Sequence, residues 1–249
     1  MGAIYNRLLK KCKRVYLKLR RGITLNLLFF KYARLLNDGR LPCRWRDRYI
    51  IAGEATATTA FDGTYVFHIA WASRIISVLR PEKHIDISSS LYFVTTLSAF
   101  VPVDFYDYRP VELNLSGLTS FFGDVTGLSF ADNSIKSLSC LHVIEHIGLG
   151  RYGDPLDPQG DIKAAQELIR VLSPDGCLLI AVPVGRQRLQ FNAHRIYNVE
   201  QVIKMFSPLE LNSFALIDDH NQFTLDADFE IANIQKYGCG CFCFRKKVG

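Results

Sequence analysis

Residues 61–244 show two alternating patterns of apolar and polar positions. Short apolar runs are typical of buried strands, and apolar residues three or four positions apart are typical of helices. The runs predict seven strands, at residues 83–87, 101–106, 120–124, 135–143, 177–182, 211–217 and 231–244. The helical pattern occurs at residues 61–79, 161–172 and 198–206, with a helix or turn at 91–100. Strands alternating with helices indicate an α/β, Rossmann-like fold with a mostly parallel seven-stranded sheet flanked by helices.

Turn-forming and capping residues agree with these boundaries. Pro81 follows the first predicted helix, and a proline ring cannot continue a helix. Ser173-Pro174-Asp175-Gly176 has the composition of a turn between a helix and a strand. Asn198 begins the last predicted helix, where its side chain is a suitable N-cap.

Charge distinguishes the first 48 residues from the rest of the 249-residue chain. They contain 14 Lys or Arg against Asp38 and Asp47, whereas the remaining 201 residues contain 16 basic and 22 acidic residues. Leucines interleaved with these basic residues predict a basic helical arm at 1–48, followed by one domain at 49–249. Two interpretations of the arm stay open. It is either an amphipathic helix in peripheral contact with an anionic membrane or an acidic partner, or a helix packed on the domain.

The sequence favours a cytoplasmic protein. The most apolar early stretch, residues 23–30, is eight residues long, and about 20 are needed to cross a bilayer. No small-residue cleavage site follows a clean apolar run, which argues against a secretory signal. The seven cysteines have no framework spacing, so free thiols in a reducing compartment are expected.

Acidic residues follow three successive predicted strands. In open parallel sheets, ligands bind beyond the carboxyl ends of the strands. Asp86 follows the first strand, Asp107 the second and Asp124 the third. Asp107 stands 21 residues after Asp86, which is the spacing of an acid that holds a nucleotide ribose. A carboxylate at Asp124 can accept a hydrogen bond from an adenine amine.

The order of these motifs resembles the class I S-adenosylmethionine-dependent methyltransferases. The motifs are Asp86-Ile-Ser-Ser-Ser90, Asp107, Gly123-Asp124, Leu141-His-Val-Ile-Glu145-His146 and Leu172-Ser-Pro-Asp-Gly176. The run from Glu145 through Asp154 to Pro158 more closely resembles the methyltransferase-like family DUF268, as do Val182-Pro-Val-Gly185 and Phe191-Asn-Ala-His-Arg-Ile-Tyr197. The resemblance covers about residues 60–244.

The resemblance implies S-adenosylmethionine as the cofactor and a set of residues that bind it. Asp86 and Ser88 would line its methionine side, Asp107 its ribose, and Asp124 with Val125 its adenine. Ser90 and His142, at the same edge of the sheet, complete the predicted cofactor-binding set. Ser88 departs from the family, which usually has glycine there, and a positive φ strains a serine. A degenerate, non-catalytic binding or scaffold protein is therefore the alternative.

The predicted activity is methyl transfer to an oxygen of a small molecule or glycan. Catalysis consists mainly of placing the acceptor in line with the methyl group. His146 or His194 would be the general base, because a neutral histidine can take the proton of a hydroxyl. Arg151, Arg195 and Tyr197 would contact the acceptor, whose phosphate or carboxylate an arginine can bind.

Other classes fit these residues less well. His142-Val-Ile-Glu145-His146 matches an inverted zinc-peptidase motif, but it closes a strand instead of lying on a helix. Alternating residues Cys239, Cys241 and Cys243 are spaced as strand core residues, so no metal site is predicted. A nicotinamide dehydrogenase would need a glycine-rich first turn. A nucleic-acid partner is not expected, because the acidic main domain has no aromatic–basic stripe.

Overall fold

The computed structural model describes residues 16, 22–36, 40–51 and 54–247, so about half of the predicted basic arm at 1–48 lies outside them. The chain divides into two units, residues 1–60 and 61–249. In the first unit, residues 22–35 are helical and a short 3-10 helix covers Trp45–Asp47. The Phe30 ring stacks on the Trp45 ring at 4.9 Å between centroids, so these two segments pack together.

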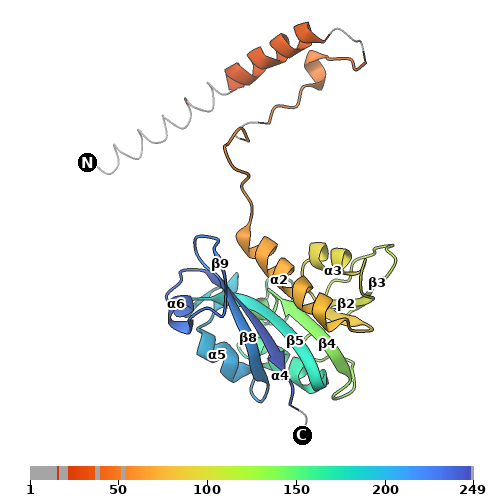
Figure 1. The fold of residues 1–249 in the computed structure, drawn as a ribbon, viewed down its shortest axis with the longest axis vertical. Helices are drawn as coiled ribbons and strands as arrows, with labels where there is room; N and C mark the ends of the chain where they lie inside the picture. The colour runs from red at the N-terminus through yellow and green to blue at the C-terminus, as the bar shows by residue number, and fades with distance from the viewer. Residues whose placement is uncertain (1–15, 17–21, 37–39, 52–53, 248–249) are drawn as a thin grey trace, which may run out of the picture. The chain divides into compact units, whose positions relative to one another are not determined.

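The second unit is built on an eight-stranded sheet of order β3-β2-β1-β4-β5-β10-β8-β9 (Figure 1). Its strands are β1 (His84–Ile87), β2 (Val103–Asp107), β3 (Leu118–Phe122), β4 (Ile135–Leu141), β5 (Leu172–Val184), β8 (Glu210–Ile217), β9 (Phe223–Leu225) and β10 (Gly238–Arg245). Strands β1 to β5 are parallel, and β10 is antiparallel to both of its neighbours. The predicted Rossmann-like fold is confirmed. Strand β9 makes eight strands instead of seven.

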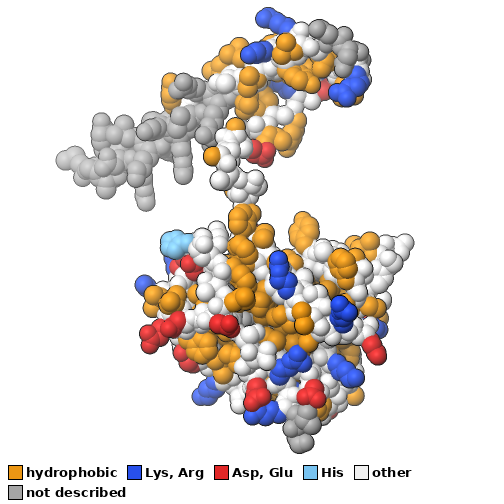
Figure 2. Space-filling model, in the orientation of Figure 1, with side chains coloured by type: hydrophobic (Ala, Val, Ile, Leu, Met, Phe, Trp, Pro, Cys, Tyr) orange, Lys and Arg blue, Asp and Glu red, His pale blue; other side chains and the backbone are white. Residues whose placement is uncertain are grey.

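Helices cover both faces of the sheet (Figure 1), and a separate apolar core lies between the sheet and the helices on each face. One face carries α2 (Gly63–Leu79) and α3 (Leu91–Leu97), which bury Trp71, Ile76 and Phe93. The other carries α4 (Gly160–Val171), α5 (Val199–Met205) and α6 (Phe229–Asn233), which bury Leu168 and Phe206. The outer side of α2 also exposes apolar side chains, which gather along it in Figure 2.

Local signals placed some boundaries correctly and others not. Asn198 caps α5 as predicted, because its side chain accepts a hydrogen bond from the Gln201 amide at 2.7 Å. The predicted turn at 173–176 lies within β5 instead. Ile135 pairs with Leu172 and Ser137 with Cys177, so the four residues bulge out of the ladder.

Two further segments differ from the prediction. The strand expected at 231–244 begins at Gly238, because Asp228 caps α6 by accepting from the Glu230 amide at 2.7 Å. The segment around His194, where no strand was predicted, forms β7 (His194–Ile196), which pairs with β6 (Arg188–Gln190). This hairpin is separate from the main sheet.

The strand order reverses beside β1. The chain runs from β1 to β2 and β3 on one side, and β4 and β5 follow on the other. Such a reversal opens a crevice at the carboxyl ends of the two central strands. The crevice therefore opens where Ser88 follows β1 and His142 follows β4.

Candidate active site

Three adjoining cavities lie beyond the carboxyl ends of β1 to β4. The first is lined by Asp124, Val125, Gly148 and Asp154. The middle cavity is lined by Asp107, Arg109, His142, Val143 and His146. The wide cavity, of about 880 Å³, is lined by Ser90, His142, His146, Arg151, His194, Asp218 and Tyr237. Because Ser88 and Tyr152 line all three, the cavities form one continuous groove.

Ser88 holds the turn between β1 and the groove in a left-handed conformation, with φ of +56°. Its amide donates a hydrogen bond to the Tyr106 carbonyl at 2.8 Å, and its hydroxyl donates to the same oxygen at 3.3 Å. A serine in this region is strained, because its Cβ crowds the backbone. The positive φ expected at this position is therefore present.

Replacing Ser88 by glycine should stabilise the protein by about 1 kcal/mol. Glycine removes the strain of the positive φ, which is of order 1–3 kcal/mol. Part of this gain is offset, because glycine loses more conformational entropy on folding than serine does. Urea unfolding measures the change. Ser90→Gly is the matched control, because Ser90 has φ of −62° and makes no side-chain cap bond. A Ser88→Gly protein no more stable than Ser90→Gly would contradict the expectation.

Asp86 lies inside β1, not beyond it as predicted. It is fully buried and lines none of the three cavities. One carboxyl oxygen accepts a hydrogen bond from the Ser89 amide at 3.0 Å, and the other accepts from the Ser139 hydroxyl. Burial raises the pKa of Asp86 to about 7, against the hydrogen bonds from Ser139 and Ser89. Asp86 therefore supports the Ser88 turn from beneath.

Asp107 and Asp124 reach the groove as predicted. Asp107 ends β2 in the middle cavity, where one oxygen accepts the Arg109 amide at 2.7 Å. Asp124 follows β3 in the first cavity, where one oxygen accepts both the amide and the hydroxyl of Thr126. Within the described residues, the second oxygen of each carboxylate accepts no hydrogen bond. Both acids can therefore accept from a ligand.

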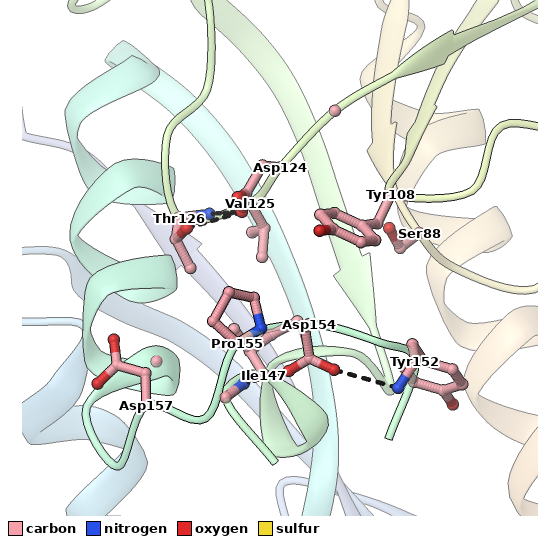
Figure 3. A pocket seen from close by; sticks show the side chains of 13 residues that line it. Ser88, Tyr108, Asp124, Val125, Thr126, Ile147, Tyr152, Asp154, Pro155 and Asp157 are labelled. Atoms are coloured by element: carbon pink, nitrogen blue, oxygen red, sulfur yellow. Dashed lines mark hydrogen bonds between the residues drawn. The ribbon is translucent and has the colours of Figure 1, made fainter. Parts of the chain in front are cut away.

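The loop after β4 closes the first cavity. Figure 3 shows Asp124 and Val125 facing Pro155 and Asp154 across it. Burial of Asp154 opposes ionisation, but hydrogen bonds from backbone amides outweigh it and lower the pKa of Asp154. Its carboxylate accepts from the amides of Gly148 at 2.8 Å and Tyr152 at 3.1 Å. Asp154 therefore organises this loop.

His146 and His194 meet at the wide cavity, 6.2 Å apart between ring centroids. His146 Nδ1 lies 2.6 Å from the Ala193 carbonyl. Since a carbonyl only accepts, this short contact places the hydrogen on Nδ1 and the lone pair on Nε2, so Arg151 Nη1, at 3.2 Å from Nδ1, does not donate to it. Burial lowers the pKa of His146, which favours the neutral ring. Arg151 borders the same cavity and donates to the Ala193 carbonyl at 3.0 Å.

Arg195 and Tyr197 lie away from the groove, which removes the geometric support for their predicted contact with an acceptor. Arg195 donates to the Ile147 carbonyl at 2.7 Å and pairs with Asp161 at 3.4 Å. The Tyr197 hydroxyl donates to the same Asp161 carboxylate at 3.0 Å, and its ring is buried. Pairing in β7 turns Arg195 toward the loop after β4, whereas Tyr197 bridges to Val184 in β5 and contacts Asp161 in α4.

Sequence reasoning missed several residues of the groove. Tyr152 borders all three cavities, and the Arg109 guanidinium lies 4.5 Å from its ring centroid. Tyr65 and Tyr237 line the wide cavity from α2 and the start of β10. Tyr152 lies in the family-like run, so its sequence position was a usable signal. The other two tyrosines had none, because tertiary packing alone brings them there.

Comparisons with known proteins agree with this architecture. The family model described as "Caenorhabditis protein of unknown function, DUF268" matches residues 129–237, which confirms the predicted resemblance over that part of the chain. No curated protein matches the chain.

Solved structures of methyltransferases share the fold. A putative methyltransferase from Bacillus halodurans C-125 has a TM-score of 0.52 and 14% identity, over 72% of this chain and 99% of that chain. A putative sarcosine dimethylglycine methyltransferase from Galdieria sulphuraria has a TM-score of 0.52 and 15% identity, over 73% and 85%. The N-methyltransferase NodS from Bradyrhizobium japonicum WM9, in complex with S-adenosyl-L-homocysteine, has a TM-score of 0.50 and 12% identity, over 72% and 86%. The chain therefore has the fold of class I S-adenosylmethionine-dependent methyltransferases.

Proposed function

We propose that the protein transfers a methyl group from S-adenosylmethionine to an oxygen atom of a small molecule or sugar. The observation that carries this proposal is the continuous groove at the carboxyl edge of the sheet, with Asp107 and Asp124 facing it. Its three cavities are joined at Ser88, so one ligand can extend from β3 past β1 toward the wide cavity.

The groove has groups suited to each part of this cofactor. Asp107 would accept from the ribose hydroxyls, and Asp124 from the adenine amine, beside the apolar Val125. Ser88, Ser90 and His142 would border the methionine end. Asp86 would act through the turn it supports. When bound, S-adenosylmethionine supplies an activated methyl group on sulfur.

The wide cavity would hold the acceptor. Its wall combines hydrogen-bonding side chains with aromatic rings, from Asp62, Thr64, Tyr65, Arg151, Asn192, Asp218, Asn221 and Tyr237. Such a mixture suits a ligand with several hydroxyl groups, and sugar rings pack on aromatic faces while their hydroxyls hydrogen-bond. His146 would take the proton of the reacting hydroxyl, and Arg151 would bind an anionic group of the acceptor.

Calorimetric titration of S-adenosylhomocysteine into the purified full chain tests the cofactor. We expect micromolar binding at one site. An acceptor screen with methyl-labelled cofactor then tests whether the acceptor atom is an oxygen. Label transferred only to amines would show that the acceptor atom is nitrogen. Absence of binding at millimolar ligand would leave the alternative, a methyltransferase-fold protein that acts as a binding or scaffold module. The strained Ser88 favours that alternative.

We further propose a cytoplasmic protein whose segment 1–48 contacts anionic membranes. Within the described residues, the helix at 22–35 exposes Ile23, Leu27 and Leu28, and the whole segment carries 14 basic residues. Apolar side chains beside basic ones are the features of an interfacial helix. No helix among the described residues is long and apolar enough to span a bilayer. The described cysteines are free, as suits a reducing compartment.

Deletion of residues 1–48 should abolish sedimentation with vesicles that contain anionic lipid. The basic residues supply the attraction, each worth about 1 kcal/mol near such a surface. Vesicles of neutral lipid are the control, and the full chain should bind them much less. If the shortened protein sediments as well as the full chain, the segment packs on the domain or binds another partner.

A further inference from the structure

We propose that His68, His142 and Cys239 form a binding site for a transition-metal ion, most suitably Zn²⁺. The site lies where α2, the end of β4 and the start of β10 meet. One ligand atom from each residue is within 4.8 Å of the other two. The three residues are far apart in the sequence, so only the fold brings them together.

His68 has one ring nitrogen that is available to a metal ion. Its side chain is fully buried, and its Nδ1 lies 2.6 Å from the Thr64 carbonyl. Since the carbonyl only accepts, Nδ1 carries the hydrogen and Nε2 the lone pair. Within the described part of the chain, Nε2 has no hydrogen-bond partner. A buried nitrogen without a partner is unfavourable, and a cation would satisfy it.

His142 is oriented in the same way by a different group. Its Nδ1 lies 2.9 Å from a carboxylate oxygen of the buried Glu145, and its Nε2 lies 3.2 Å from Cys239 Sγ. A histidine that donates one ring nitrogen to a carboxylate and offers the other to a metal is the usual arrangement at zinc centres. Both histidines therefore leave Nε2 for a metal ion, and that of His142 lies against the Cys239 thiol.

The ligand types and the spacing suit zinc. Bonds of about 2.0–2.1 Å to nitrogen and 2.3 Å to sulfur place tetrahedral ligand atoms about 3.5 Å apart. The observed 3.2 Å contact and the 4.8 Å limit bracket that separation. One thiolate and two imidazoles favour zinc over magnesium or calcium, which prefer oxygen. Binding would release the Cys239 thiol proton to solvent.

Three protein ligands leave one coordination position open, as at catalytic zinc centres. His142 also lines the wide and middle cavities, so the site borders the groove. Resting on the proposed function, a metal there would bind an acceptor hydroxyl and lower its pKa. Metal binding itself does not depend on that function.

Titration of Co²⁺ into the chelator-treated full chain tests the site. We expect one equivalent to bind, with a thiolate charge-transfer band and the visible bands of tetrahedral cobalt, and Zn²⁺ to displace it. Cys239→Ser should remove the charge-transfer band. Glu145→Gln should weaken binding about 10–100-fold, because it acts through His142. His68→Asn should also weaken binding, since asparagine keeps a donor for Thr64 but lacks Nε2.

Cys241→Ser is the matched control, and it should keep the band. Cys241 is buried on the same strand, and its Sγ lies 3.9 Å from that of Cys239. Should a variant fail to fold, the unchanged protein still decides the question, because its melting temperature should rise with Zn²⁺ and not with Mg²⁺. No thiolate band in the unchanged protein would overturn the proposal, as would a band lost in Cys241→Ser but kept in Cys239→Ser. S-adenosylhomocysteine titration of the metal-free protein reports separately on the proposed function.

Discussion

Replacement of Asp107 by asparagine should weaken the binding of S-adenosylhomocysteine about 30-fold. Hydrogen bonds to a charged group contribute about 2 kcal/mol, and each 1.4 kcal/mol corresponds to a factor of ten. The asparagine oxygen can still accept from the Arg109 amide, so the turn after β2 should be kept. What changes is the second oxygen, which becomes an amide that cannot accept from a ribose hydroxyl. Calorimetric titration measures the affinity directly.

Asp104→Asn provides the matched control in the same strand. Asp104 lies three residues earlier in β2 and pairs with Lys83 at 2.8 Å, away from the three cavities. This variant should bind S-adenosylhomocysteine like the unchanged protein. Equal losses in both variants would trace the effect to β2 stability and not to a ribose contact. Unchanged affinity in Asp107→Asn would contradict the proposed place of the ribose.

Replacement of His146 by glutamine should lower kcat about 100-fold or more with an acceptor found by the screen. General bases contribute about 10²–10⁴-fold to a rate. His146 is preferred over His194 because its Nε2 lies 3.6 Å from the buried Glu145 carboxylate. That negative charge would stabilise the imidazolium that forms when His146 takes a proton. The affinity for S-adenosylhomocysteine should stay unchanged.

The pH profile gives a second reading of the same group. Burial lowers the pKa of His146, with Arg151 and His142 acting in the same direction and Glu145 against them. The active base is the neutral ring, so kcat/KM, which reports on the free protein, should rise with pH through a pKa below 6.5 and be level near neutrality. His194→Gln should keep this limb. If His194→Gln removes the limb and His146→Gln does not, the base is His194.

Much of the fold could be predicted because the spacing of apolar residues within each helix or strand indicates its type. Strand β5 has an uninterrupted apolar run over residues 177–184, apolar residues alternate with polar ones in β1 and β2, and Asn198 marks a helix start by its own side chain. Where the prediction was wrong, a tertiary contact overrode the local sequence signal. Residues 173–176 have turn composition, yet pairing of β5 with β4 continues on both sides of them.

The candidate site divides in the same way. Asp107 and Asp124 could be found because residues beyond parallel strands share one edge of the sheet. Arg195 and Tyr197 were expected there too, but pairing within the β6–β7 hairpin turns Arg195 to Asp161, and the bridge to β5 turns Tyr197 to the same carboxylate. Strand pairing depends on partners distant in the sequence, and a one-residue shift reverses every side chain. The direction of these side chains was therefore outside the reach of a local pattern.

By itself, the sequence determined the Rossmann-like class, the charge difference between residues 1–48 and the rest, and the acids of the groove. These features depend on composition and on the spacing of apolar and polar residues along the chain. The tertiary structure alone decided that Asp86 is buried and that His68 lies beside His142 and Cys239. The physical reason is that burial and the distance between remote side chains arise only when packing closes the chain on itself.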